Sequence, residues 1–186
     1  MFQGPQFVPG KAFFTAGVGI HKEKLTSFEM ALRDAGIAQH NLVRVSSIFP
    51  PGCEMVSREE GSGLLRPGQV VFCVLSEAAT NEPSRRIGSS VGVAIPADSS
   101  KYGYISEHHA FGQSKRAMGD YAEDLAASML ATVLGVPFDP DEAWDERREQ
   151  WKLSGNIVET QNHTIVAEGP EEGEWVTTVS AAVFCG

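Results

Sequence analysis

The stretch Asn41-Leu42-Val43-Arg44-Val45-Ser46-Ser47-Ile48-Phe49-Pro50-Pro51 organises this sequence of 186 residues. It begins as a strand, because most of its residues are β-branched or large and apolar. The Pro-Pro pair ends that strand, since proline cannot donate to the hydrogen-bond ladder of a sheet. Two adjacent serines, Ser46 and Ser47, therefore lie where a strand ends. The simplest interpretation is a polar strand end packed against a turn.

The same stretch also resembles a segment with a specific chemistry. It is similar to the self-cleavage segment of the pyruvoyl-dependent arginine decarboxylases, in which Asn-Leu-aliphatic-Arg-aliphatic-Ser-Ser-Ile-x-Pro-Pro contains the bond that is cut. The resemblance extends over roughly residues 12–134 and, more loosely, over the C-terminal fifty residues. It implies a cut between Ser46 and Ser47, which would give one chain of residues 1–46 and another of residues 47–186.

The chemistry of such a cut explains why a serine is needed. A hydroxyl one residue after a peptide carbonyl can attack that carbonyl if the backbone is strained and a donor stabilises the oxyanion. Here Ser47 Oγ would attack the carbonyl carbon of Ser46 and give an ester. Elimination of that ester and hydrolysis with loss of ammonia would leave a pyruvoyl group at position 47. This covalent cofactor acts as an electron sink, as pyridoxal phosphate does in other enzymes.

Composition indicates one soluble domain with a full core, because 42% of the residues are hydrophobic. The net charge of −9 argues against a nucleic-acid partner and agrees with a cationic substrate. No apolar run approaches the roughly 18 residues of a spanning helix, so no membrane association is expected. The three cysteines have no C-x-x-C spacing, which favours a reducing cytoplasm and gives no zinc motif. Adjacent His108 and His109 on a strand point to opposite faces, so no metal site is expected.

Hydrophobic periodicity predicts an α+β protein with two main helices. We expect a helix over 28–35 with Ser27 as its N-cap, and a helix over 115–134 between Ser114 and Gly135. The charged segment 141–153 is a candidate surface helix, and 53–67 and 76–86 are expected to be loops. Strands are expected at 12–19, 41–49, 70–75, 87–95, 102–107, 157–168 and 175–184, the last two as a hairpin.

The resemblance sharpens this outline of the fold. It implies a single domain over residues 1–186, built as a four-layer αββα sandwich, and a homotrimer whose active site lies between neighbouring chains. The layer order is an implication of the family and does not follow from the periodicity.

The resemblance also assigns residues to roles, each with a simpler alternative. Glu107, in the segment Gly103-Tyr104-Ile105-Ser106-Glu107, corresponds to the family's proton donor, but a carboxylate at a solvated strand end fits the pattern too. Asn41 corresponds to an asparagine that donates to the oxyanion, and the alternative is a turn asparagine. Glu29 corresponds to an acidic residue that faces the substrate guanidinium, with Leu32 beside it; the alternative is a first-turn carboxylate complementing the helix dipole.

The sequence therefore predicts a carboxy-lyase that converts L-arginine to agmatine and carbon dioxide with a pyruvoyl group made from Ser47. Two alternatives stay open. One is a pyruvoyl decarboxylase for another amino acid, and the other is an oligomeric binding protein of the same fold that never cuts itself.

Overall fold

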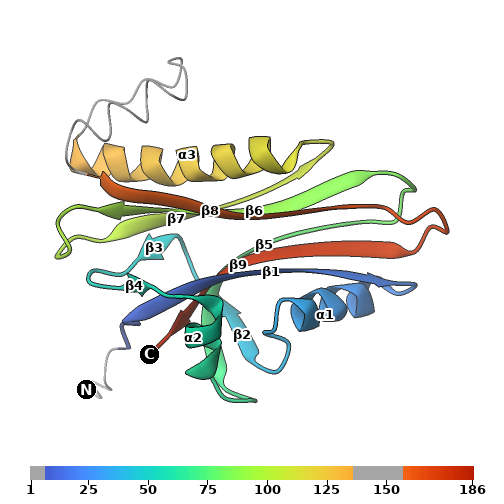
Figure 1. The fold of residues 1–186 in the computed structure, drawn as a ribbon, viewed down its shortest axis with the longest axis horizontal. Coiled ribbons are helices and arrows are strands. Elements are labelled where there is room, and N and C mark those ends of the chain that lie inside the picture. Colours follow the sequence, from blue (N-terminus) through green and yellow to red (C-terminus); the bar gives the residue numbers. More distant parts are fainter. Residues whose placement is uncertain (1–6, 136–156) are drawn as a thin grey trace, which may run out of the picture.

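Two stacked β-sheets form the centre of the molecule, and helices cover their outer faces (Figure 1). The structure is a computed structural model that describes residues 7–135 and 157–186. Helices α1 (Lys24–Asp34) and α2 (Arg58–Gly63) lie on the outer side of one sheet, and α3 (Lys115–Leu134) covers the other (Figure 1). This layer order confirms the predicted four-layer αββα sandwich. The predicted helix over 141–153 lies outside the described residues.

The two sheets differ in size and in strand order. Sheet A has the order β2-β5-β9-β1-β4, and sheet B has the order β3-β7-β6-β8. The long neighbours pair antiparallel, whereas β2 and β4 each pair parallel to an adjacent strand. The strands of sheet A are β1 (Lys11–His21), β2 (Asn41–Arg44), β4 (Glu54–Met55), β5 (Val70–Thr80) and β9 (Trp175–Cys185). Those of sheet B are β3 (Ile48–Phe49), β6 (Arg86–Pro96), β7 (Gly103–Phe111) and β8 (Ile157–Glu168).

Close contacts at glycines fix the position of each main helix against its sheet. A Cβ at Gly19 on β1 would lie 2.0 Å from the carbonyl oxygen of Ser27 in α1. A Cβ at Gly92 on β6 would lie 2.3 Å from the carbonyl oxygen of Ala122 in α3. Only glycine permits such close approach of backbones. The space between the sheets is filled by buried apolar side chains, among them Phe49, Val74, Val93, Ile105 and Phe184.

The prediction for the longest helix is confirmed at both ends. Ser114 Oγ accepts a hydrogen bond from the Ala117 N–H at 3.2 Å, as an N-cap does. Gly135 has φ of 69° and closes the helix in the left-handed conformation. For α1 the predicted cap is wrong, because the helix begins at Lys24 after Glu23. Ser27 is instead buried inside the helix, and its Oγ lies 2.7 Å from Thr177 Oγ1 on β9.

Two predictions about strand connection are also wrong. The expected strand over 41–49 is two strands, since β2 belongs to sheet A and β3 belongs to sheet B. The expected hairpin at the C-terminus does not form, because β8 pairs with β6 in sheet B and β9 lies between β5 and β1 in sheet A. Both segments contain the residue types that favour strands, but residue type does not say which sheet a strand joins.

The two expected loops contain regular structure as well. Segment 53–67 includes β4 and helix α2, which Ser57 caps by accepting from the Glu60 N–H. Strand β5 continues past residue 75 to Thr80, although its last residues include Ser76 and Glu77. Polar composition misled the prediction here, because Ser76 is buried and donates to the His108 carbonyl oxygen of sheet B at 2.6 Å.

Candidate active site

The link between β2 and β3 carries the two serines from one sheet to the other. On the side of sheet A, the Val45 N–H donates to the Cys73 carbonyl oxygen at 3.0 Å. On the side of sheet B, the Ile105 N–H donates to the Ser47 carbonyl oxygen at 2.8 Å. The Ser46–Ser47 peptide bond is therefore held between two hydrogen bonds, one to each sheet.

Within this link the chain makes a tight turn around Ser47. The Ile48 N–H donates to the Ser46 carbonyl oxygen at 3.1 Å, which closes a three-residue turn. The side chain of Ser46 lines an apolar cavity of about 460 Å³. Phe7, Val45, Ile48, Phe72 and Phe184 are among its other lining residues. The residue whose carbonyl the sequence predicts to be attacked thus borders an apolar cavity.

Glu107 is placed near this link by β7. It lies two residues after Ile105, which holds the Ser47 carbonyl, and alternation puts both residues on the same face of the strand. Burial raises the pKa of the Cys73 thiol to about 11, and the nearby Glu107 carboxylate adds to that rise while the Arg44 guanidinium opposes it. The carboxylate of Glu107 is therefore within electrostatic range of the strand that pairs with β2. Its residue is exposed, so the described part of one chain does not enclose it.

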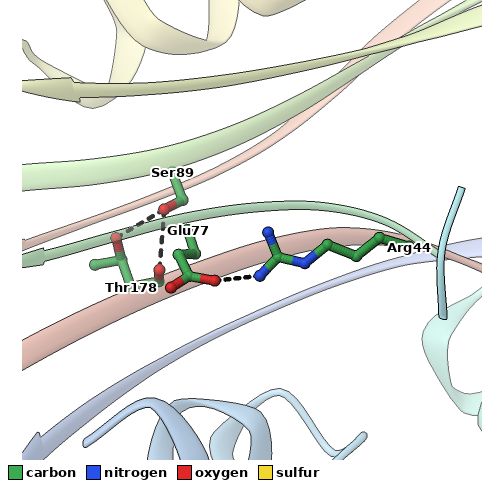
Figure 2. Close-up of polar contacts among 4 residues, drawn as sticks. All are labelled: Arg44, Glu77, Ser89 and Thr178. Carbon is green, nitrogen blue, oxygen red and sulfur yellow. Dashed lines mark hydrogen bonds and ion pairs between the residues drawn. The ribbon is translucent and has the colours of Figure 1, made fainter. Parts of the chain in front are cut away.

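A second cavity of about 380 Å³ lies between α1 and the edge of sheet A. Leu32 and Asn41, two of the predicted site residues, are brought together here. Phe28, His40, Leu42, Arg44 and Leu75 complete the lining. The Arg44 guanidinium forms an ion pair with the Glu77 carboxylate of β5 (Figure 2). Arg44, which lines the cavity, is thus already paired with a carboxylate.

Glu29 lies on the same helix but does not point into a closed site. Its Oε1 accepts from Arg33 Nε at 2.7 Å, an ion pair of residues four apart on α1. The side chains of Glu29 and Arg33 are 41% and 71% exposed. The carboxylate of Glu29, which the sequence predicts to bind the substrate guanidinium, is thus already paired with the guanidinium of Arg33 on the same helix.

Asn41 is separated from the serine pair by the length of β2. Its Nδ2 donates to the Gly68 carbonyl oxygen at 2.8 Å, and the strand runs from there to the link. Four residues of strand span about 13 Å, so Asn41 does not reach the Ser46 carbonyl within one chain. The structure brings Ser46, Ser47 and Glu107 to one region, and Leu32 and Asn41 to another.

Polar contacts between the sheets were not anticipated from the sequence. Ser89 Oγ of β6 lies 3.0 Å from the Thr178 carbonyl oxygen and 2.8 Å from Thr178 Oγ1 of β9 (Figure 2). Ser180 Oγ donates to the His163 carbonyl oxygen at 2.6 Å. Glu77 was also not predicted from the sequence as the partner of Arg44, because segment 76–86 is expected to be a loop. Its partner is 33 residues away, and no local pattern connects the two.

The described residues offer neither a metal-binding cluster nor a membrane-spanning helix. Among residues 7–135 and 157–186, no three side chains of the metal-ligating types lie close enough together to hold an ion. His108 instead packs on Tyr121, with ring centroids 4.6 Å apart. No helix in the described part of the chain is long and apolar enough to cross a membrane.

Comparison with known proteins gives a consistent answer over nearly the whole chain. The family model described as pyruvoyl-dependent arginine decarboxylase matches residues 11–186. A probable pyruvoyl-dependent arginine decarboxylase of Chloroherpeton thalassium is 58% identical over 178 residues, which are 96% of this chain and 98% of the relative. The probable enzyme of Chlorobium limicola is 60% identical with the same coverage. The pyruvoyl-dependent arginine decarboxylase of Methanococcoides burtonii is 55% identical over 177 residues, covering 95% of this chain and 98% of the relative.

Proposed function

Since the chain belongs to the pyruvoyl-dependent arginine decarboxylase family, we propose that it cuts itself between Ser46 and Ser47 and then converts L-arginine to agmatine and carbon dioxide. The observation that carries this proposal is the geometry of the link between the sheets. The expected scissile bond is held at both ends and is turned tightly at Ser47, where a nucleophilic hydroxyl is required.

The residues around position 47 fit a pyruvoyl group formed there. Such a group, once formed, supplies an electron sink for decarboxylation. The carbonyl of residue 47 is retained in the cut chain, and its hydrogen bond from the Ile105 N–H supports residue 47 on β7. Glu107 lies two residues further along the same strand and face. It is our candidate for the group that delivers a proton to the substrate Cα after carbon dioxide has left.

A single chain leaves this site incomplete, which supports an oligomer. Glu107 is exposed, and Asn41 lies about four strand residues from the link. Three apolar residues here are each 39–40% exposed: Val43 on edge strand β2, Val45 in the link and Ile48 on edge strand β3. Exposed apolar edges of this kind are normally covered. We therefore propose that a neighbouring copy, in a homotrimer, covers this edge and supplies the Asn41 amide to the oxyanion.

The substrate guanidinium is proposed to bind at α1 and the cavity beside it, in the neighbouring copy that supplies Asn41. The relatives are named as arginine decarboxylases, and arginine needs a carboxylate partner for its guanidinium. Glu29 is the candidate for that partner, and Leu32 lines the neighbouring cavity. Glu29 already forms an ion pair with Arg33. We therefore expect the substrate guanidinium to replace that of Arg33 when arginine binds.

The mass of the purified protein tests the cleavage, and carbon dioxide release tests the activity. We expect two fragments, residues 1–46 and 47–186, the larger one carrying a carbonyl that reacts with hydrazine. Ser47→Ala should remain one chain of 20.0 kDa without that carbonyl. A wild-type protein that stays intact after long incubation would support the alternative of a non-catalytic binding protein. A cut protein that releases carbon dioxide from other amino acids but not from arginine would refute the substrate alone.

A further inference from the structure

The scissile segment itself supplies a donor to the expected oxyanion. The Ile48 N–H donates to the carbonyl oxygen of Ser46, with 3.1 Å between nitrogen and oxygen. This is the carbonyl that Ser47 Oγ is proposed to attack. Among the described non-glycine residues only Ser84 has a positive φ, so the turn centred on Ser47 is of the inverse γ type.

The pairing of β3 with β7 explains why this N–H is available. Ile48 is in register with Tyr104, and Phe49 with Gly103, in an antiparallel pair. The pair before Ile48 and Tyr104 on this ladder is Ser47 with Ile105. This pair is a hydrogen-bonded one, because the Ile105 N–H donates to the Ser47 carbonyl oxygen. Residue pairs alternate along an antiparallel ladder, so the Ile48 N–H points away from β7. It is directed back to Ser46 and takes no part in holding the sheet together.

We propose that the backbone N–H of Ile48 is an oxyanion donor for the self-cleavage reaction, an inference that rests on the proposed function. In the step concerned, a bond forms between Ser47 Oγ and the Ser46 carbonyl carbon, and the carbonyl electrons move onto the Ser46 oxygen. When they return, the bond to the Ser47 nitrogen breaks, and the proton lost from Oγ ends on that nitrogen. The product is an ester isomer of the same composition. Negative charge on the Ser46 oxygen strengthens a hydrogen bond that is already in place.

The surrounding hydrogen bonds keep this donor in position while the carbonyl changes shape. Val45 is held to sheet A and the Ser47 carbonyl to sheet B, so the turn cannot open without breaking a bond to one sheet. The Asn41 amide of the same chain is bonded to Gly68 at the far end of β2. Within one chain, the Ile48 N–H is therefore the described donor that needs no rearrangement to act, and a side chain from a neighbouring copy would add to it.

Replacing the amide of residue 48 by an ester removes the N–H and keeps the side chain. The α-hydroxy analogue of isoleucine can be incorporated during cell-free synthesis, and the conversion of full-length chain to fragments can then be followed by mass. Removing one oxyanion donor typically lowers a rate by roughly 10²- to 10³-fold, and we expect a loss of about a hundredfold. The matched control is the same change at Cys53, whose N–H donates to the Pro50 carbonyl oxygen at 3.1 Å in the next turn.

The outcomes separate this inference from the proposed function. If the wild-type chain does not cut itself, the proposed function fails. If the wild type cuts and the ester variants at 48 and 53 have similar rates, only the role of Ile48 is refuted. A second measurement avoids the need for the ester protein to fold. In uncut Ser47→Ala, nuclear magnetic resonance should show slow hydrogen exchange at the Ile48 amide and a coupling across the hydrogen bond to the Ser46 carbonyl carbon. Fast exchange without that coupling would overturn the inference.

Discussion

Glu29 gives a quantitative prediction, because the structure shows what arginine must displace. Its carboxylate is held by Arg33 at 2.7 Å, and both side chains are substantially exposed. An exposed pair of residues four apart on a helix contributes about 0.3–0.5 kcal/mol. Removing the carboxylate from a desolvated contact with a substrate guanidinium costs about 2–5 kcal/mol. When the substrate guanidinium replaces that of Arg33 at Glu29, the net gain in binding free energy is therefore about 1.5–4.5 kcal/mol.

Two substitutions on α1 should consequently shift the Michaelis constant for arginine in opposite directions. Glu29→Gln should raise it tenfold or more, since each 1.4 kcal/mol is a factor of about ten. Arg33→Gln should lower it about twofold, because it frees the carboxylate from its partner. Glu29→Asp keeps the charge and should be tolerated much better than Glu29→Gln.

Steady-state kinetics with agmatine as a product inhibitor provides the assay. Agmatine keeps the guanidinium, so its inhibition constant should change by the same factor as the Michaelis constant. Self-cleavage should be unaffected in all three variants, because α1 is not part of the scissile link. Equal Michaelis constants for wild type, Glu29→Gln and Arg33→Gln would show that the guanidinium is bound elsewhere. An effect of Glu29→Gln on arginine but not on agmatine would show that Glu29 acts on another part of the substrate.

Two further predictions concern the acid and the buried thiols. Glu107→Gln keeps the shape of the side chain and removes its acidic proton. The protein should therefore be cut normally, while carbon dioxide release slows by roughly 10²- to 10⁴-fold. Near-normal turnover would mean that another group delivers the proton. Burial raises the pKa of Cys73 and of Cys53 from 9.0 to about 11, so the folded state holds these protons more tightly than the unfolded state. The resulting stability is complete below about pH 9 and is lost as the pH rises through about 11, by up to roughly 2–3 kcal/mol for Cys73. Urea denaturation between pH 8 and pH 11 should show this decline, and it should be smaller in Cys73→Ala; an identical decline in that variant would exclude Cys73 as its source.

Local rules predicted the elements whose ends are marked by their own residues. Helix α3 begins after Ser114 and ends at Gly135 as expected, because both caps are short-range features. Ser27 looked like a similar cap, yet it is buried against Thr177 from the other end of the chain. A serine that caps a helix and a serine that packs on a sheet look the same in sequence. Only the tertiary contact distinguishes them.

The assignment of strands to sheets was beyond the reach of sequence patterns. The sequence places the serines at the end of one strand, whereas in the structure they lie in the link between two short edge strands, β2 of sheet A and β3 of sheet B. One continuous strand and two short strands in different sheets can have the same residue types, so the sequence does not distinguish them. The motif predicts which residues react, whereas the geometry of the link depends on the contacts of Val45 with Cys73 and of Ser47 with Ile105, which are 28 and 58 residues away in the chain. Nothing near the serines in sequence indicates these partners.

The position of the link explains how the fold would survive the proposed cut between Ser46 and Ser47. Residues 1–46 contribute β1, α1 and β2, and β1 is paired with β9 along its whole length, from Lys11 opposite Cys185 to His21 opposite Trp175. Strand β2 pairs with β5, and α1 packs on β9, so strands β5 and β9 of the larger fragment bind the smaller one. Cutting the link removes a connection between the sheets, but it removes none of these pairings. Because the expected scissile bond lies in the link between β2 and β3, breaking it leaves the long strand pairings in place, and these hold together the sandwich that must afterwards support the proposed reaction.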